Sequence, residues 1–492
     1  MIDLRKGAAV ALVLLWAGAV AAQQAPAKPK QTPPPAQPAK KVHFPAFAQK
    51  TLANGLRIVV VEQHESPAVG LQLLVQAGKR YEAPAKAGLS QATAELLTQG
   101  TATRSAQQIA ETIDAVGGDL GIRGAWDAAY ANVQVTSDQI DLGLDLLTDV
   151  LFHPSFPPEE IERWRSQTLN SLQIQQQDAA YLADAVFDRA VLGDHPYGLP
   201  DAGTPESVQG ITRDDLVAFH KARYVPDGAI LAVVGDVKAD DAFAKAERAF
   251  GGWKKGGGAQ VPAVQPPERT KPRVIVVDKP DAVQTEIRIG QIGLAFTDPD
   301  YFVALIYNSV LGEGGSARLY NEVRRNRGLS YGAESSFVPA YQPGPFTVST
   351  FTKSESSAEA VKVSLDVIEG LAKEPVPATE LTDRKTYLVG AFPLQIETPQ
   401  GIASKVVEAL KYNYDRAWLE SYRDKLDAVT AQQVQSFAQR RIHPDKALIV
   451  LAGNAAAFKA DLEKVYGPVE VIPYKEVDLL RADLRKAAEP KK

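Results

Sequence analysis

The sequence contains no cysteine, and this absence excludes several kinds of bond and site at once. No disulfide can form, no thiolate can hold a metal, and no cysteine can act as a nucleophile. Paired imidazoles are missing as well, because no two histidines lie three or four residues apart and none can share a helix face. The six histidines are His43, His64, His153, His195, His220 and His443. Without disulfides or thiolate metal sites, packing alone must stabilise the fold.

We expect His195, in GDHPYG, to be a loop residue with hydrogen-bonded ring nitrogens.

A basic field and a long apolar run are also missing. The net charge of -5 gives no surface for nucleic acid, so nucleic acid is not expected as a partner. Arg5 and Lys6 precede an apolar run over residues 8–20, and Ala21 and Ala22 follow it, which predicts a secretory signal peptide over residues 1–22. The run is shorter than the roughly 20 residues of a membrane span. We therefore expect cleavage near Ala22, no membrane span afterwards and a periplasmic or secreted protein; a retained anchor is the alternative.

Two segments rich in proline divide the rest of the chain. Residues 23–41, QQAPAKPKQTPPPAQPAKK, have almost nothing to bury and predict an extended linker. Residues 254–272, KKGGGAQVPAVQPPERTKP, separate two stretches of similar length, 42–253 and 273–475. The sequence thus predicts an N-terminal domain, an interdomain linker, a C-terminal domain and a polar tail over residues 476–492.

The two predicted domains repeat each other. LDLLTDVLFHPSFPPEEIER begins at Leu144, and the similar LDVIEGLAKEPVPATELTDR begins at Leu365. RYVPDGAILAVVGDV begins at Arg223, and RIHPDKALIVLAGN begins at Arg441. Because both pairs occur in the same order and at nearly the same separation, they indicate an internal duplication into two tandem homologous domains.

Each domain is predicted to be of the α+β class. LRIVVVE from Leu56, AVGLQLLVQAG from Ala68 and AILAVVGD from Ala229 are typical of strands. The segments that begin at Ala87, Ser105, Ser137, Pro158 and Ala179 have the apolar spacing of helices. Strands and helices come in runs rather than in strict alternation, which favours a mostly antiparallel sheet with helices packed on one face in each domain.

Seven segments, in order along the chain, resemble the insulinase and pitrilysin family of zinc peptidases, which includes the mitochondrial processing peptidase. They are TLANGLRIVVVE, AGKRYEAPAKAGL, QGTATRSAQQIAE, FPPEEIER, GDHPYG, PDGAILAVVGDV and ARLYNEVRRNRGLSYG. The resemblance covers about residues 47–469. It implies two hinged domains that form a clam-shell chamber around an unfolded or extended peptide.

The zinc motif of that family, His-x-x-Glu-His, does not occur in this chain. When Gly88 and Gly100 set the register, Gln91 and Glu95 stand at the histidine positions and Ala94 stands at the general base. The resemblance puts the third ligand about 76 residues further on, at Ser171. Zinc binding at the three ligand positions would lack imidazole, and an amide is a poor zinc ligand. We therefore expect no metal and no catalytic residue in this chain, and a solvated or hydrogen-bonded helix face at Gln91 and Glu95.

One feature of the family is retained in ARLYNEVRRNRGLSYG. In the resembling enzymes an Arg and a Tyr seven residues apart reach toward the carbonyl group of the bound peptide, and Arg324 and Tyr331 have this spacing. Residues 317–326 are predicted to form a helix that Gly328 ends, and a strand follows, so the two side chains can converge. We predict that they bind substrate. The alternative is a surface ion pair for Arg324 and a half-buried strand position for Tyr331.

Two glycine-rich motifs are set aside. GLSYG, residues 328–332, matches G-x-S-x-G, but the predicted helix precedes the serine and the predicted strand follows it, the reverse of a hydrolase nucleophile turn. LGEGGSARL, from Leu311, lacks the Lys-Ser/Thr ending of a phosphate loop, and we expect a turn or a flexible strip near the peptide path.

Together these patterns lead to one hypothesis and two alternatives. The leading hypothesis is an exported, non-catalytic subunit of a zinc peptidase of this family, inactive alone, whose partner is a homologous chain that carries His-x-x-Glu-His and the zinc. A second copy of this chain is the other possible partner. The first alternative is a stand-alone protein that binds unfolded peptides or acts as a scaffold. The second, an active peptidase with another mechanism, needs a nucleophile or metal site that the sequence does not contain.

Overall fold

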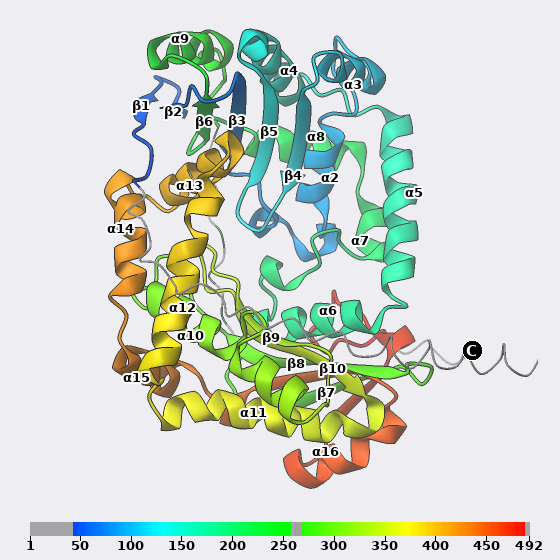
Figure 1. The fold of residues 1–492 in the computed structure, drawn as a ribbon. Helices are drawn as coiled ribbons and strands as arrows, with labels where there is room; N and C mark the ends of the chain where they lie inside the picture. Colours follow the sequence, from blue (N-terminus) through cyan, green and yellow to red (C-terminus); the bar gives the residue numbers. More distant parts are fainter. Residues whose placement is uncertain (1–42, 257–260, 262, 264, 266, 488–492) are drawn as a thin grey trace, which may run out of the picture. The chain divides into compact units, whose positions relative to one another are not determined.

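The first half of the chain forms a six-stranded sheet whose strands do not follow sequence order (Figure 1). The structure, a computed structural model, describes residues 43–487 apart from 257–260, 262, 264 and 266, so the predicted signal peptide and linker, 1–22 and 23–41, lie outside the described residues. The strand order is β1-β2-β6-β3-β5-β4, in which β2 and β6 pair in parallel and the other neighbours pair antiparallel. The strands are β1 (Ala48–Thr51), β2 (Arg57–Glu62), β3 (Ala68–Val75), β4 (Asp119–Gly124), β5 (Ala129–Thr136) and β6 (Ile230–Gly235).

The second half repeats this sheet. Its order is β12-β7-β11-β8-β10-β9, and β7 pairs in parallel with β11 and β12. The strands are β7 (Arg273–Asp278), β8 (Gln284–Ile292), β9 (Ala333–Phe337), β10 (Pro345–Lys353), β11 (Leu448–Gly453) and β12 (Glu470–Pro473). The predicted α+β fold with two homologous domains is confirmed, and both sheets are mixed rather than purely antiparallel.

The helices repeat as well, because the two similar sequence segments form the same helix pair in each half. The first half contains α2 (Leu89–Leu96), α3 (Ala106–Asp114), α4 (Ile140–Phe152), α5 (Pro158–Gln175), α6 (Ala179–Leu192), α7 (Pro205–Gly210), α8 (Arg213–Arg223) and α9 (Ala239–Phe250). The second contains α10 (Tyr301–Gly312), α11 (Ser357–Lys373), α12 (Ala378–Ala391), α13 (Pro399–Lys411), α14 (Arg416–Asp427), α15 (Ala431–Arg441) and α16 (Lys459–Tyr466). The segment from Leu144 thus forms the end of α4 and the start of α5, and the segment from Leu365 forms the end of α11 and the start of α12.

Both faces of the central strands of each sheet are buried, and helices from different halves cover them. In β2, Ile58 and Val60 face the helices of their own half, whereas Val59 and Val61 belong to a cluster that α13 closes. In the second sheet, Val450 and Ala452 of β11 lie against α6 of the first half. Strands buried on both faces read as continuous apolar runs. Each large apolar side chain that is fully buried contributes roughly 1.5–3 kcal/mol. The prediction of helices on one face thus describes only the helices of the same half, and a helix from the other half covers the second face (Figure 1).

A polar link accompanies each exchanged helix. On β3, Gln72 is buried and its amide donates to Ser404 of α13 at 3.3 Å. On β8, Arg288 is buried and its guanidinium donates to Asp184 of α6 at 3.3 Å. Gln72 pairs with Ala232 and Arg288 with Val450, which are equivalent residues in the two repeats. These hydrogen bonds fix the position of each helix along the sheet that it covers.

The predicted polar tail begins with residues that the structure folds back onto the second half. Val477 and Arg485 form an antiparallel bridge, and Leu479 and Leu484 are buried in the cluster that contains α6. Polar composition does not reveal this, because two leucines among charged residues suffice to anchor the segment. Among the described residues, no helix is both long and apolar enough to cross a membrane.

A buried carboxylate joins the two halves. Asp127, in the turn between β4 and β5, is 1% exposed and lies 2.8 Å from the ammonium of Lys411 at the end of α13. It also accepts hydrogen bonds from the N–H of Tyr341, at 3.1 Å, and from the hydroxyl of Tyr197. Burial opposes ionisation of Asp127, but Lys411 and the hydrogen bonds outweigh it and hold the pKa of this carboxyl below its ordinary value.

Replacing this carboxylate should destabilise the whole molecule. Asp127→Asn leaves Lys411 buried without its counter-charge, so we expect the free energy of unfolding to fall by about 3–5 kcal/mol. Urea unfolding followed by circular dichroism measures the change. The control is Asp141→Asn, whose carboxylate is 68% exposed and pairs with Lys245; its effect should stay within about 1 kcal/mol. Equal effects of the two substitutions would show that Asp127 does not anchor the halves.

Candidate functional site

Helix α2 carries Gln91, Ala94 and Glu95, and its start is held by a buried carboxylate. Gly88 precedes the helix at φ +90°, and a Cβ atom there would lie 2.8 Å from the carbonyl oxygen of Ala202. Only glycine fits that conformation and space. The carboxylate of Glu82 accepts the N–H groups of Gly88, at 3.1 Å, and of Ser90, at 2.5 Å. The helix therefore begins in one defined orientation.

Gln91 and Glu95 face each other on α2, one helical turn apart. The amide of Gln91 donates to a carboxylate oxygen of Glu95 at 2.5 Å, and its carbonyl accepts the N–H of Gly124 on β4 at 3.1 Å. The other carboxylate oxygen of Glu95 accepts the indole N–H of Trp164 on α5 at 2.9 Å. The two positions that the resemblance equates with zinc-binding imidazoles thus satisfy each other and their neighbours.

Ala94 and Ser171 lie apart from this cluster. Ala94 is fully buried, and its methyl group has no acid or base function. Ser171 is exposed on α5, and its hydroxyl accepts a hydrogen bond from Gln175 on the same helix at 3.4 Å. Trp164, two turns before Ser171, makes the contact with Glu95 instead.

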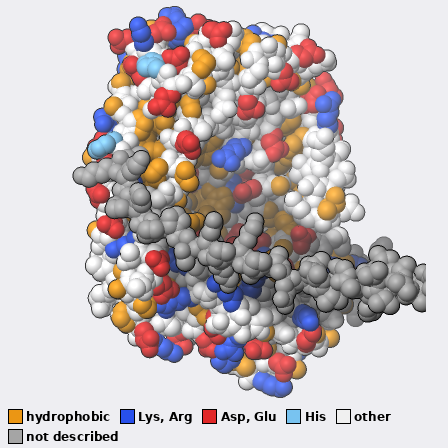
Figure 2. Space-filling view, viewed as in Figure 1, with side chains coloured by type: hydrophobic (Ala, Val, Ile, Leu, Met, Phe, Trp, Pro, Cys, Tyr) orange, Lys and Arg blue, Asp and Glu red, His pale blue; other side chains and the backbone are white. Residues whose placement is uncertain are grey.

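These residues do not fit the zinc ion that the resemblance implies. An amide and one carboxylate replace two imidazoles, and both already hydrogen-bond to protein groups. No group of three or more histidine, aspartate or glutamate side chains with the arrangement of a metal site occurs in the described part of the chain. In Figure 2 the surface over β4 and α2 is hollowed, with Lys, Arg, Asp and Glu side chains at its walls.

Arg324 and Tyr331 lie together in the second half. A π-helical segment, Tyr320–Asn326, carries Arg324, and Gly328 at φ +63° turns the chain toward β9. The guanidinium of Arg324 lies 4.0 Å from the ring centre of Tyr331 and 4.8 Å from that of Tyr320, whose hydroxyl accepts a hydrogen bond from it. Tyr331 is 74% exposed. The helix, the stop and the strand occur in the predicted order, and they leave the Tyr331 hydroxyl and part of the guanidinium open to a ligand.

A cavity of about 370 Å³ adjoins this pair. Tyr320 and Gly332 line it next to the pair, and Gly314 and Gly315 of the LGEGGSARL segment line another side. The segment follows α10 and forms part of the cavity wall. In GLSYG, the Ser330 hydroxyl donates to the carbonyl of Gly332 at 2.7 Å, between a helical segment and a strand.

His195 is buried in a loop after α6. Its Nδ1 accepts the N–H of Tyr197 at 3.2 Å, and its ring packs edge-on against that tyrosine. This agrees with a hydrogen-bonded loop residue.

Sequence analysis did not single out Trp164, Tyr320 or Glu82. Helical spacing could have indicated two of them. Tyr320 lies four residues before Arg324, and Trp164 lies seven residues before Ser171. Each therefore shares a helix face with a residue that the sequence did indicate. Glu82 has no such signal, because it reaches α2 from the preceding loop.

Comparisons with known proteins agree with the duplicated fold. Residues 57–200 match the family profile described as insulinase (peptidase family M16), and residues 210–388 match the one described as peptidase M16 inactive domain. An uncharacterized zinc protease of Mycobacterium leprae is 28% identical over 423 residues, which are 85% of this chain and 94% of that protein. An uncharacterized zinc protease of Bacillus subtilis, YmxG, is 24% identical over 82% of this chain and 97% of its own length.

Solved structures extend the likeness. The crystal structure of a peptidase M16 inactive domain from Pseudomonas fluorescens is 29% identical, with a TM-score of 0.78, over 83% of this chain and 98% of that chain. A protease from Helicobacter pylori has the same fold, with a TM-score of 0.77 at 21% identity over 84% of this chain and 100% of that chain.

The buried carboxyl at the start of α2 should make stability depend on pH. Burial raises the pKa of Glu82 from 4.5 to about 7, and burial also raises that of Asp188 on α6 from 3.8 to about 7. The folded protein holds these protons up to about pH 7, whereas the unfolded chain releases them near pH 4, so stability present at low pH is lost as pH rises toward 8. The free energy of unfolding, measured with urea, should fall between pH 5.5 and pH 8.5. In Asp188→Asn this fall should be smaller by about 2 kcal/mol.

The control for this experiment is Asp240→Asn, at an exposed position in the first turn of α9. It should keep the pH dependence of the unchanged protein. If Asp188→Asn keeps that dependence too, Asp188 ionises normally in the folded state and the expectation is wrong.

Proposed function

The chain belongs to the insulinase family of peptidases, M16, and we propose that it acts there as a non-catalytic subunit that binds peptide beside a zinc-bearing partner. Several of its relatives are named zinc proteases. The proposal keeps their substrate class, an unfolded or extended peptide, and assigns the chemistry to another chain.

The contact between Arg324 and Tyr331 is the observation that carries the proposal. Stacking against Tyr320 and Tyr331 holds the guanidinium in a fixed plane. A fixed guanidinium and a phenolic hydroxyl are donors that can bind a peptide carbonyl or the oxyanion that forms from it. A surface ion pair, the other reading of Arg324, would not require two aromatic rings around it.

The first half would supply binding surface rather than catalysis. Gln91 and Glu95 bond to each other, and Ala94 offers no base, so these three positions of α2 supply no group to activate water. Strand β4 ends the sheet on this side, and its outer edge lies beside Gln91. An extended peptide can pair with such an edge through main-chain hydrogen bonds.

A partner must then provide the metal and the general base. Zinc in such a partner would polarise the scissile carbonyl and activate a water molecule, while Arg324 and Tyr331 orient the same peptide. The predicted signal peptide supports assembly outside the cytoplasm, in the periplasm or after secretion.

Removing the guanidinium should lower peptide turnover by the assembled pair. With a homologue of the same host that carries His-x-x-Glu-His, Arg324→Ala is expected to reduce the initial rate of hydrolysis of an unstructured peptide about tenfold to a hundredfold, because a donor to the reacting carbonyl is lost. Tyr331→Phe should lower the rate as well, while size-exclusion chromatography shows the complex unchanged.

The matched control is Arg327→Ala, three residues away. Arg327 is exposed and its guanidinium pairs with Glu322 at 2.8 Å. Its loss should change the rate less than about twofold. An Arg324→Ala pair as active as the unchanged pair would remove the proposed role of Arg324.

Native mass spectrometry of the protein purified from its own host tests the partner. We expect a heterodimer with one zinc ion, released together with the homologous chain. A metal-free monomer or homodimer would favour the stand-alone peptide-binding or scaffold protein. Zinc on this chain alone would contradict the alignment of Gln91 and Glu95 with the imidazole positions.

A further inference from the structure

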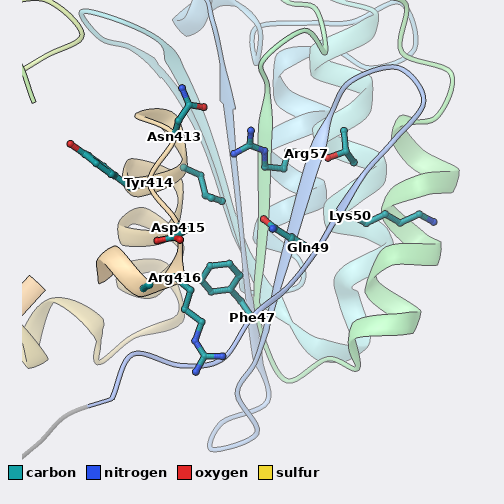
Figure 3. Close-up of a pocket in the computed structure, with 11 residues that line it drawn as sticks. Phe47, Gln49, Lys50, Arg57, Asn413, Tyr414, Asp415 and Arg416 are labelled. Carbon is teal, nitrogen blue, oxygen red and sulfur yellow. The ribbon is translucent and has the colours of Figure 1, made fainter. Parts of the chain in front are cut away.

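A second cavity, of about 680 Å³, lies at the edge of the first sheet that β1 forms (Figure 3). Residues of β1 and β2 line one side of it, and the turn between α13 and α14 lines the other; the lining residues are Phe47, Gln49, Lys50, Thr51, Arg57, Leu410, Asn413, Tyr414, Asp415, Arg416 and Ala417. The cavity therefore joins an edge strand of the first half to a turn of the second.

The backbone of β1 presents two residues to this cavity. Leu52 and Leu56 form a hydrogen-bonded pair, since the Leu52 N–H donates to the Leu56 carbonyl. In an antiparallel ladder the next pair, Thr51 and Arg57, is then not hydrogen-bonded. The backbone of Arg57 is consistent with this pattern, because its N–H group points away from β1 and donates to the carbonyl of Ala229. The N–H and C=O groups of Thr51, and of Gln49 two residues earlier, therefore point outward from the sheet.

All four residues of β1 are exposed, and in the described part of the chain no strand pairs with its outer edge. Unpaired strand edges are sites where another strand can add, and soluble proteins usually cover or charge them. Among the described residues no strand covers this edge, and a cavity with room for side chains adjoins it.

The cavity is cationic. Arg57 lies on the same sheet face as Thr51 and is half-buried, and its guanidinium has no hydrogen-bond or ion-pair partner among the described residues. Arg416 adds a second guanidinium, which Glu420 pairs at 2.8 Å. The acidic group in the lining is Asp415, and its carboxylate accepts the Trp418 N–H at 3.0 Å, as the cap of α14.

We propose that β1 and this cavity bind an extended, acidic segment of another protein, which adds to the sheet as a seventh strand. Main-chain hydrogen bonds to Gln49 and Thr51 would hold the segment, and a carboxylate of the segment would pair with Arg57. The charge of the segment decides the partner, because a basic segment would face the guanidinium of Arg57, which has no acidic partner among the described residues.

Two other occupants are less suitable. The linker of this chain, residues 23–41, has four lysines, no acidic residue and six prolines, so it has the wrong charge and lacks many of the N–H groups that pairing requires. A peptide substrate bound along β4 would lie at the opposite edge of the six-stranded sheet, about 24 Å away at the usual strand spacing. The β1 site is therefore separate from the proposed substrate site.

Fluorescence anisotropy with two labelled octapeptides tests the proposal on the full chain. One peptide alternates valine with glutamate, and the other alternates valine with lysine. The glutamate peptide should bind at least about tenfold more tightly, and Arg57→Gln should weaken its binding about tenfold. Thr51→Pro, which removes an outward N–H group, should also weaken it.

Lys362→Gln on α11 is the control for the loss of a cation elsewhere on the surface. Its side chain is 67% exposed, its ammonium pairs with Asp366 at 2.6 Å, and Lys362 does not line the cavity. We expect a change of less than about twofold. Thermal unfolding of each variant shows whether it is folded. Arg57→Gln changes one half-buried side chain and leaves the backbone groups in place, so it keeps the test independent of the proline variant.

Equal binding of the two peptides, or unchanged binding by folded Arg57→Gln, would overturn the proposal. If Arg324→Ala removes binding and Arg57→Gln does not, the peptide occupies the proposed substrate site instead. Binding that depends on Arg57 would support the β1 site even if Arg324 had no role in turnover.

Discussion

The exchange of helices α6 and α13 between the halves is the contact on which the other features of the molecule depend. Each helix closes the second apolar face of the sheet in the other half, and neither sheet could bury Val59 and Val61, or Val450 and Ala452, with its own helices. The exchange also explains the charged residues in the interior. Asp127 meets Lys411 only because Lys411 ends α13, and Arg288 meets Asp184 only because α6 crosses the second sheet. The buried polar contacts thus exist because apolar packing brings α6 and α13 onto the opposite sheets, and they fix the orientation of these helices.

The two halves share one fold, but they differ in how their polar side chains are bonded. In the first half, the helix face at Gln91 and Glu95 is closed by hydrogen bonds to Trp164 and Gly124, so its polar groups need no ligand. In the second half, Arg324 is held by aromatic stacking, which orients the guanidinium without neutralising its charge. The polar groups of the first surface bond to one another, whereas Arg324 and Tyr331 keep donors that face outward. This difference, within a duplicated fold, supports the proposal that the chain binds peptide rather than cleaves it.

Local sequence patterns predicted the features that depend on residues close together in the sequence. The strands, the duplicated helix pairs and the convergence of Arg324 with Tyr331 follow from periodicity, turn residues and short spacing. The exchange of α6 and α13 could not be predicted in this way, because contacts such as Gln72 to Ser404 join residues far apart in the chain. The role of Trp164 was hidden for the same reason. The cavity at β1 was hidden because Arg57 reads as an ordinary polar residue at a strand start, and the turn at Asn413 that forms the other wall is far away in the sequence.

The exchange of helices also sets the order in which the chain can fold. Strands β2, β3 and β6 are complete by residue 235, but the helix that covers their second face ends at residue 411. During synthesis from the N-terminus, an apolar sheet face must wait for the second half, with its edges open to other chains. Contacts over so long a span make folding slow. A fragment cut between the halves would therefore expose one bare apolar sheet face on each piece, and such a face favours aggregation.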